Sequence, residues 1–175
     1  SETEEGDEVL IQRPVYYPFA DSIQQQKRVV VNSPLQLRDG RYEIDFADFE
    51  RKAASPRCRA FVLSNPHNPV GRVYTEEELR RVGEICRRHH VFVIADEIHS
   101  DLIFPGHQHI VFASLGQDYA ENCAVCHAPS KTFNLAGLSF SCIMIPNEER
   151  RKRFDQMFAR YCRAHPNFFA PVAAK

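Results

Sequence analysis

Short apolar runs alternate along the chain with longer stretches in which apolar positions recur every three or four residues. The short runs predict strands at about residues 9–11, 28–31, 60–63, 91–95, 124–127 and 140–145. The longer stretches predict helices at about residues 18–26, 45–54, 75–90 and 147–162. Strands and helices that take turns in this way predict an α/β domain.

Local signals mark the starts of two of these helices. Thr75 and Glu78 have the spacing of a capping box, and Asp45 is expected to cap the helix that follows it. Asp39 and Gly40 predict a tight turn. The helix that Thr75 opens carries apolar residues on one face, namely Leu79, Val82, Ile85 and Cys86.

The predicted strands lack the polar alternation of a sheet with one wet face. A mostly parallel sheet with helices on both faces explains this pattern, so we expect a three-layer fold. Ligands of such sheets bind at the carboxyl ends of the strands. Three segments are expected there: residues 64–71, 96–101 and 129–132.

Each of these segments carries a side chain that could bind a ligand, but none is decisive alone. SNPHNPVG, residues 64–71, has two Asn-Pro steps, which favour either a rigid loop that holds an Asn amide or a plain connector. Asp96 can cap the next helix or serve as an anion in a polar pocket. Lys131 stands in a Ser-Lys-Thr turn, where most lysines are simply exposed.

Taken together and in this order, the segments resemble a known family. PVYYPF (14–19), SNPHNPVGRVYTEEEL (64–79), ADEIHSDL (95–102) and APSKTFNLAGL (128–138) are similar to motifs of the fold type I, aspartate-aminotransferase-like enzymes that use pyridoxal phosphate. The resemblance is strongest to the C–S lyases of the cystathionine β-lyase PatB/MalY type, which belong to the class I/II aminotransferase superfamily. It runs from about residue 6 to residue 171, and it implies the large domain of the pyridoxal-phosphate transferase fold.

The resemblance implies catalytic roles for two residues. Lys131 matches the lysine that holds the cofactor as a Schiff base and, once substrate displaces it, moves the α-proton. Asp96 matches the carboxylate that pairs with the pyridine nitrogen of the cofactor. Its negative charge keeps that nitrogen protonated, so that the ring can accept electrons.

The same resemblance implies further residues that bind the cofactor. Asn68 and His99 match residues that bind the 3-hydroxyl oxygen of the ring; a histidine there, where many aminotransferases have tyrosine, is typical of the lyase branch. Tyr16 matches the aromatic residue that stacks on the ring, and Tyr17 beside it is the weaker candidate. Ser130 matches a residue that binds the phosphate.

Some of the family's pattern is not found in the chain. Ser139 stands where many aminotransferases place an arginine on the phosphate, so the phosphate contact is expected to be weaker or to come from elsewhere. The family's glycine-rich phosphate loop is expected before Ser1, and its small domain, with the arginine for the substrate carboxylate, after Lys175. We therefore expect residues 1–175 to be part of a large domain, incomplete at both ends, of an enzyme that is a homodimer at full length.

Three functions remain open. A C–S β-lyase splits cystathionine or a cysteine-type substrate into a thiol, pyruvate and ammonia, whereas an aminotransferase passes the amino group to a 2-oxo acid. We expect the lyase, with the aminotransferase as the alternative. The third possibility is a truncated, non-catalytic fragment, and we expect the isolated 175 residues to be inactive.

Composition narrows the class of partner. Lys and Arg number 22 and Asp and Glu 23, which gives no electrostatic reason to expect nucleic acid. No apolar run approaches the roughly 18 residues of a membrane span, and the acidic start of the chain is unlike a signal peptide. The six cysteines have no disulfide spacing, so we expect reduced thiols and a cytoplasmic protein. A small amino-acid substrate is the partner that remains.

Zinc is the competing chemistry. Cys123, Cys126 and His127 form a Cys-x-x-Cys-His sequence, and His107 and His109 stand two residues apart. A single Cys-x-x-Cys without a second pair is a weak signal, and Cys126 falls in a predicted buried strand. We therefore predict no metal site.

Overall fold

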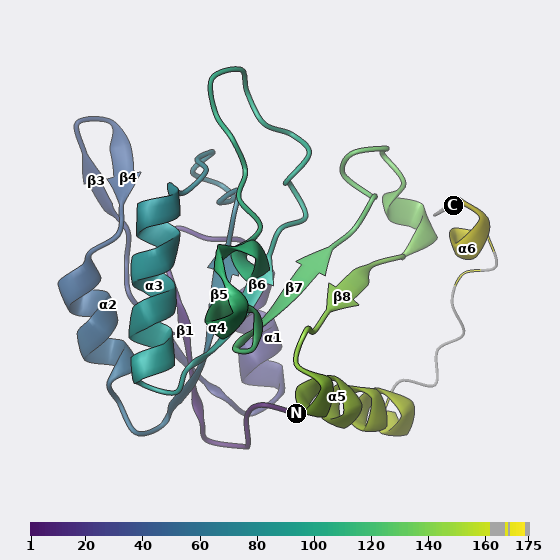
Figure 1. Ribbon diagram of the computed structural model, residues 1–175, viewed down its shortest axis with the longest axis horizontal. Helices are drawn as coiled ribbons and strands as arrows, with labels where there is room; N and C mark the ends of the chain where they lie inside the picture. The colour runs from purple at the N-terminus through teal and green to yellow at the C-terminus, as the bar shows by residue number, and fades with distance from the viewer. Residues whose placement is uncertain (162–166, 168, 174–175) are drawn as a thin grey trace.

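The computed structural model describes residues 1–161, 167 and 169–173, which form a six-stranded sheet, a small hairpin and helices on both faces of the sheet (Figure 1). The strands lie in the order β2-β1-β5-β6-β7-β8. Neighbouring strands are parallel except for β8, which runs antiparallel to β7. Their bounds are β1 Glu8–Ile11, β2 Val29–Asn32, β5 Cys58–Ser64, β6 Phe92–Asp96, β7 Cys123–His127 and β8 Cys142–Met144. The expected α/β fold with a mostly parallel sheet is confirmed.

One face of the sheet is covered by fewer helices than the other. The helix α1 packs on one face, while α2 and α3 pack on the other, and the short helices η1 and α4 lie beside α3 (Figure 1). The hairpin β3–β4 precedes α2. The bounds of these elements are α1 Pro18–Gln25, β3 Gln36–Arg38, β4 Arg41–Glu43, α2 Phe46–Ala53, α3 Glu76–Arg88, η1 Phe112–Leu115 and α4 Gln117–Ala120; η2 Ala136–Leu138, α5 Glu148–Tyr161 and α6 Ala170–Ala173 follow.

The strand β1 illustrates burial on both faces of the sheet. Val9 and Ile11 pack in the same cluster as Ile23 of α1, whereas Leu10 belongs to the cluster under α2 and α3. Val9, Leu10 and Ile11 are each 5% exposed or less. Because successive side chains point to opposite faces, a sheet covered twice needs apolar residues at consecutive positions. This explains why the sequence shows unbroken apolar runs.

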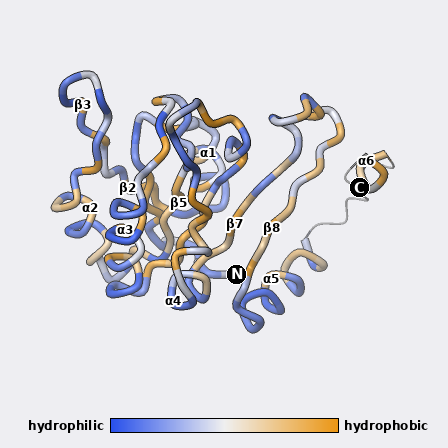
Figure 2. The backbone as a smooth tube through the Cα atoms, turned by 45° about the horizontal axis from the view of Figure 1, so that its top comes forward, coloured by the Kyte–Doolittle hydropathy of each residue, from blue (hydrophilic) through white to orange (hydrophobic). Residues whose placement is uncertain are grey.

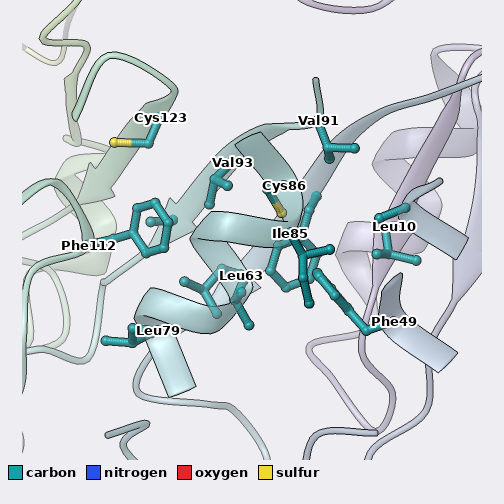
Figure 3. Close-up of a cluster of buried hydrophobic side chains, with 14 of the residues drawn as sticks. Leu10, Phe49, Leu63, Leu79, Ile85, Cys86, Val91, Val93, Phe112 and Cys123 are labelled. Atoms are coloured by element: carbon teal, nitrogen blue, oxygen red, sulfur yellow. The ribbon is translucent and has the colours of Figure 1, made fainter. Parts of the chain in front are cut away.

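The larger core fills the space between the sheet and the helices α2 and α3 (Figure 3). Phe49 of α2 meets Phe61 of β5 edge to face, with ring centroids 4.9 Å apart. Leu79, Val82, Ile85 and Cys86, the predicted apolar face of α3, are at most 2% exposed. Each large apolar side chain buried in this way contributes about 1.5–3 kcal/mol to stability.

The predicted local signals are present as hydrogen bonds. Asp45 accepts a hydrogen bond from the backbone N–H of Asp48 at 3.0 Å. Thr75 Oγ1 accepts from the N–H of Glu78 at 3.2 Å, and Glu78 Oε2 accepts from the N–H of Thr75 at 2.8 Å, which completes the capping box. Asp39 and Gly40 have φ angles of 49° and 77° and form the turn of the β3–β4 hairpin. Positive φ at both central residues is the geometry of a type I′ turn.

The last part of the described chain is packed less closely. All three residues of β8 are exposed, and no residue of α5 is buried. Ile145, between them, packs against Phe92 and Ala124. Figure 2 shows β8 running beside β7, with the loop that joins them extending away from the rest of the molecule and apolar stretches along it. The predicted helix at 147–162 corresponds to α5, and Cys162 lies outside the described residues.

Candidate functional site

The loops that follow β5, β6 and β7 lie along one edge of the sheet, at the top of Figure 1. At this edge is a cavity of about 360 Å³. Ligand pockets usually measure about 300–1,000 Å³. All six residues that the sequence singled out line this one cavity: Tyr16, Asn68, Asp96, His99, Ser130 and Lys131.

Asp96 is the acidic group of the cavity. It ends β6, and its Oδ1 accepts a hydrogen bond from the backbone N–H of Ile98 at 3.3 Å. Burial raises the pKa of the Asp96 carboxyl; the N–H of Ile98 and the nearby His99 lower it, and the charge of Glu97 raises it further. Within the described residues, no lysine or arginine forms an ion pair with Asp96. A buried carboxylate of this kind is stabilised by a ligand that brings a positive charge.

Asn68 is held by the loop between β5 and α3. Its backbone N–H donates to Ser64 Oγ at 3.3 Å, and the Ser64 hydroxyl donates to the carbonyl oxygen of Pro66 at 3.3 Å. Ser64 is itself buried at the end of β5 and lines the same cavity. The loop therefore presents the Asn68 amide from a fixed backbone.

Lys131 and Ser130 come from the loop that follows β7. The carbonyl oxygens of Pro129 and Ser130 accept hydrogen bonds from Phe133 and Leu135, both at 3.0 Å, which forms a turn around Lys131. Lys131 is exposed, and Ser130 is partly buried. This loop is joined to the loop after β6, because the Thr132 hydroxyl donates to Asp101 at 2.7 Å.

Tyr16 and His99 complete the set from two other segments. Tyr16 is 46% exposed, and its ring packs edge to face on Phe19, with centroids 5.6 Å apart. His99 lies three residues after the end of β6, and its carbonyl oxygen accepts from the N–H of Leu102 at 2.9 Å. A half-exposed aromatic ring at a cavity wall is available to stack on a flat ligand.

Serine hydroxyls line the remaining wall. Ser139, which stands where many aminotransferases have an arginine, lines the cavity together with Ser130 and Ser141. Its φ angle of 50° lies in the left-handed region, which few residues other than glycine adopt. No arginine is among the described residues that line the cavity. An anionic group would therefore meet neutral hydroxyls on this side.

Two larger cavities adjoin the first. One of about 580 Å³ lies on the α1 side of the sheet and also contacts Asp96, but it lacks Lys131, Asn68 and His99. The other, of about 670 Å³, shares Asn68 and His99 with the first and is bordered by apolar residues of the loop after β6. The 360 Å³ cavity is the one at which the amine, the carboxylate and the amide meet, so it is the candidate active site.

Sequence reasoning did not identify a second polar pair at the same strand end. Glu97, next to Asp96, is 2% exposed; it accepts from the backbone N–H of Phe112 at 2.8 Å and pairs with His109 Nε2 at 2.9 Å. The pair joins the far part of the loop after β6 to the strand itself. A glutamate directly after a buried strand was the available signal, but its partner lies 12 residues further on.

The residues considered for zinc make other contacts. His109 pairs with Glu97, and burial raises the pKa of the Cys123 thiol to about 12 and that of the Cys126 thiol to about 11. Thiols in this state are poor metal ligands, since zinc binds the thiolate. The described part of the chain holds no group of three or more side chains arranged to bind a metal ion. Its five cysteines, Cys58, Cys86, Cys123, Cys126 and Cys142, are all free thiols.

None of the helices within the described ranges has both the length and the apolar character that crossing a membrane requires.

Residues 2–175 match the aminotransferase class I and II family. The chain belongs to this family. Cystathionine beta-lyase PatB of Bacillus subtilis is 46% identical over 171 residues, which are 98% of this chain and 44% of that protein. The aspartate aminotransferase of Geobacillus stearothermophilus is 28% identical over 171 residues, 98% of this chain and 42% of that protein. The recognition of the family from its motifs is thus confirmed.

Solved structures agree with the sequence comparison. The crystal structure of cystalysin from Treponema denticola, which contains a pyridoxal 5'-phosphate cofactor, superposes with a TM-score of 0.93 and 38% identity, over 96% of this chain and 43% of that one. The chain therefore spans less than half the length of these relatives.

Proposed function

We propose that the chain is the cofactor-binding part of a pyridoxal-phosphate enzyme that acts as a C–S β-lyase on cystathionine or a related cysteine derivative. The observation that carries this proposal is the single cavity lined by an amine, a buried carboxylate and an amide, from Lys131, Asp96 and Asn68. The identity of 46% to a cystathionine beta-lyase, against 28% to an aspartate aminotransferase, favours the lyase.

The residues of the cavity fit pyridoxal phosphate. When bound, this cofactor supplies an electron sink for amino-acid chemistry. Asp96, whose pKa is raised by burial, gains a cationic partner if it faces a protonated ring nitrogen. Lys131 would hold the cofactor covalently through its amine and, when substrate takes its place, would take and return the α-proton.

The other cavity residues would orient the cofactor ring. Asn68 and His99 present a donor from the amide and a donor or acceptor from the imidazole to the 3-hydroxyl oxygen. Tyr16 would stack on the ring, and the hydroxyls of Ser130 and Ser139 would contact the phosphate. The histidine at position 99 is the side chain in the cavity that the resemblance associates with the lyase branch.

The reaction proposed for the whole enzyme is the β-elimination of a thiol from cystathionine. Cystathionine and water give homocysteine, pyruvate and ammonia: the bond between the β-carbon and sulfur breaks, and the sulfur leaves with the electron pair. The amine of Lys131 removes the α-proton, and this places electrons where they can expel the thiolate. A transamination, the alternative, keeps the C–S bond and needs a 2-oxo acid as acceptor.

Further proposals concern the whole protein. The match to PatB takes in 98% of this chain but only 44% of PatB. This supports a partial large domain that is accompanied by further segments in the whole protein. A homodimer and a cytoplasmic location are proposed for the full gene product; the free thiols of the five described cysteines are in keeping with that location. The isolated 175 residues are expected to be inactive, since Lys131 is exposed and the described residues that line the cavity include no arginine for the substrate's carboxylate.

The first experiment separates the two reactions. The full gene product, loaded with pyridoxal phosphate, is given L-cystathionine without any 2-oxo acid, and thiol, pyruvate and ammonia are measured. We expect the three products in equal amounts. Turnover that appears only when a 2-oxo acid is added would identify an aminotransferase instead.

A second experiment tests the two catalytic assignments. Borohydride reduction should attach the cofactor to the peptide that contains Lys131, as detected by mass spectrometry. Lys131→Ala should lose both this attachment and the production of pyruvate, whereas Lys152→Ala, on the exposed face of α5, should retain both. Asp96→Asn should keep the size of the side chain and lose most of the rate. Attachment of the cofactor to another lysine in the active protein would overturn the assignment.

A further inference from the structure

His67 uses both nitrogens of its ring inside the protein. It lies in the loop between β5 and α3, and 2% of it is exposed. Its Nε2 is 2.9 Å from the carbonyl oxygen of Pro14, and its Nδ1 is 2.8 Å from the hydroxyl oxygen of Tyr74. Neither hydrogen bond was foreseen from the sequence, where the histidine stands between two Asn-Pro steps.

These two contacts determine the tautomer of the ring. A carbonyl oxygen can only accept, so the proton must be on Nε2, which donates to Pro14. Nδ1 is then unprotonated and accepts from the Tyr74 hydroxyl. Burial raises the pKa of Tyr74 well above its ordinary value, so this hydroxyl remains a donor.

The charge of the ring agrees with this arrangement. Burial lowers the pKa of His67 to about 4, and the positive charge of Arg72 contributes to the lowering against the effect of the hydrogen bond to Pro14. The ring is therefore neutral at physiological pH. A protonated ring would have donors on both nitrogens and would lose the acceptor that Tyr74 requires.

Tyr74 is held in place from three directions. Its backbone N–H donates to Asn65 Oδ1 at 3.1 Å, the residue is 1% exposed, and the guanidinium of Arg72 lies 4.5 Å from the ring centroid. Arg72 is in turn paired with Glu78 of α3. The hydroxyl that sets the tautomer of His67 thus belongs to a side chain with little freedom to move.

The contacts of His67 connect two segments of the candidate active site. Pro14 lies two residues before Tyr16, and His67 directly precedes Asn68; Tyr16 and Asn68 both line the cavity. The hydrogen bond between the imidazole and Pro14 therefore joins the backbone behind one cavity residue to the backbone beside the other. The two segments are 53 residues apart in the sequence.

We propose that His67 is a positioning residue of the cofactor site: as a neutral imidazole in one tautomer, fixed by Tyr74, it sets the spacing between the segment that carries Tyr16 and the loop that carries Asn68. The inference rests on the proposed function, because the spacing of the two segments matters only if the flat ring of pyridoxal phosphate binds between them. A flat ring that is stacked on one side and hydrogen-bonded on its edge requires such a fixed spacing.

The test uses two amides of different reach in the full gene product. In His67→Gln, the amide nitrogen extends to the position of Nε2 and can still donate to Pro14. In His67→Asn, the shorter amide reaches only the position of Nδ1, so it keeps a partner for Tyr74 and loses Pro14. His89→Asn, at the end of α3 and outside the cavity, is the matched control.

Three quantities are measured for each folded variant: the dissociation constant for pyridoxal phosphate, the visible circular dichroism of the bound cofactor, and the Tm of the cofactor-free protein. We expect His67→Asn to weaken cofactor binding about tenfold, the equivalent of about 1.4 kcal/mol, and to change the dichroism. His67→Gln should remain within about threefold of the wild type, and His89→Asn should match it. A purely structural role would lower Tm and leave the other two quantities unchanged.

Several results would overturn the positioning role of His67. Equal losses in His67→Asn and His67→Gln, or wild-type binding and dichroism in His67→Asn, would overturn the positioning role. If His67→Asn does not fold, Tyr74→Phe decides, because it removes the partner that fixes the tautomer: about threefold weaker binding supports the role, and wild-type binding overturns it. The dissociation constant of the wild-type gene product is measured first. If the wild type does not bind pyridoxal phosphate, the proposed function itself is contradicted.

Discussion

Two regions of the molecule differ sharply in how they are packed. In the core region, residues 8–128, apolar side chains such as Leu10, Phe49 and Phe61 are fully buried between the sheet and its helices. In the arm, residues 129–161, which contains β8 and α5, Ile145 is the one buried residue. The apolar side chains that the arm exposes most include Phe133 at 67%, Tyr161 at 66%, Phe158 at 51% and Met144 at 50%.

The candidate active site straddles the boundary between these regions. Asp96, Asn68 and His99 project from the ends of strands and loops of the core region, whereas Lys131 and Ser130 belong to the arm. The core region holds its site residues on buried strands and on the loops that follow them. The arm exposes apolar surface of the kind that interfaces cover, so we expect the position of Lys131 relative to Asp96 to depend on what packs against the arm.

The largest expected effect is the loss of a core aromatic ring. Phe49→Ala should lower the free energy of unfolding by about 3–5 kcal/mol, because it removes a ring that is 0% exposed and leaves a cavity beside Phe61. Phe158→Ala, in the arm, should change it by about 0.5 kcal/mol or less in the 175-residue chain. Urea unfolding of both variants measures the difference. Similar losses from the two substitutions would remove the distinction between core region and arm.

The second effect is a pH dependence that originates in the core region. In the unfolded chain, His67 takes up a proton near its ordinary pKa of 6.5, but in the folded chain only near 4, since burial disfavours the charged ring. Between these pH values the unfolded state binds more protons, so the free energy of unfolding falls as the pH is lowered from about 6.5 to 4, by up to about 3 kcal/mol. Above pH 7 this group contributes no pH dependence.

Comparison with a variant isolates the contribution of His67. His67→Gln should flatten the slope between pH 4 and 6.5, whereas His90→Gln, at an exposed position, should leave it as in the wild type. Urea unfolding at a series of pH values gives the slopes. An unchanged slope in His67→Gln would mean that the imidazole does not titrate as inferred.

A smaller effect is expected from the capping box at the start of α3. Thr75→Ala should cost about 1 kcal/mol, because the N–H of Glu78 loses its acceptor and the box is broken. Thr75→Ser keeps the hydroxyl and should stay near the wild type. Thermal unfolding of the two variants checks this; equal Tm values would show that the cap contributes nothing to the core region.

The parts of the fold that follow from local chemistry could be predicted. The buried strands were visible because a sheet covered on both faces needs continuous apolar residues, and Thr75 and Asp45 mark helix starts through their own side chains. Of the β3–β4 hairpin, only the Asp39-Gly40 turn was predicted, since its strands are three residues long and largely polar; Leu37 is 61% exposed. The antiparallel direction of β8 could not be predicted, because a short apolar run carries no information on its direction.

The candidate site shows the same division. The rule that ligands bind at strand ends selected segments whose side chains share one cavity. The pairing of Glu97 with His109, however, depends on how the loop after β6 folds back. In the sequence, the nearby His107 suggested instead that His109 could be a zinc ligand. The role of His67 depends on a carbonyl group, that of Pro14, and no side-chain pattern marks the position of a carbonyl in space.

The smallest effect bears most directly on the arm. Ile143, in the middle of β8, is 44% exposed, and threonine has a similar preference for strands. Ile143→Thr should therefore change the free energy of unfolding of the 175-residue chain by about 0.5 kcal/mol or less. In the full gene product, where we expect another segment or a second subunit to cover β8, the same substitution places a hydroxyl in an apolar contact and should cost about 1–3 kcal/mol. Parallel urea titrations of the two forms measure both values under the same conditions. A difference between the forms would show that residues outside this chain complete the arm, and with it the wall of the cavity that holds Lys131. The same small value in both would mean that β8 remains exposed in the whole protein and that Lys131 is positioned by its own loop.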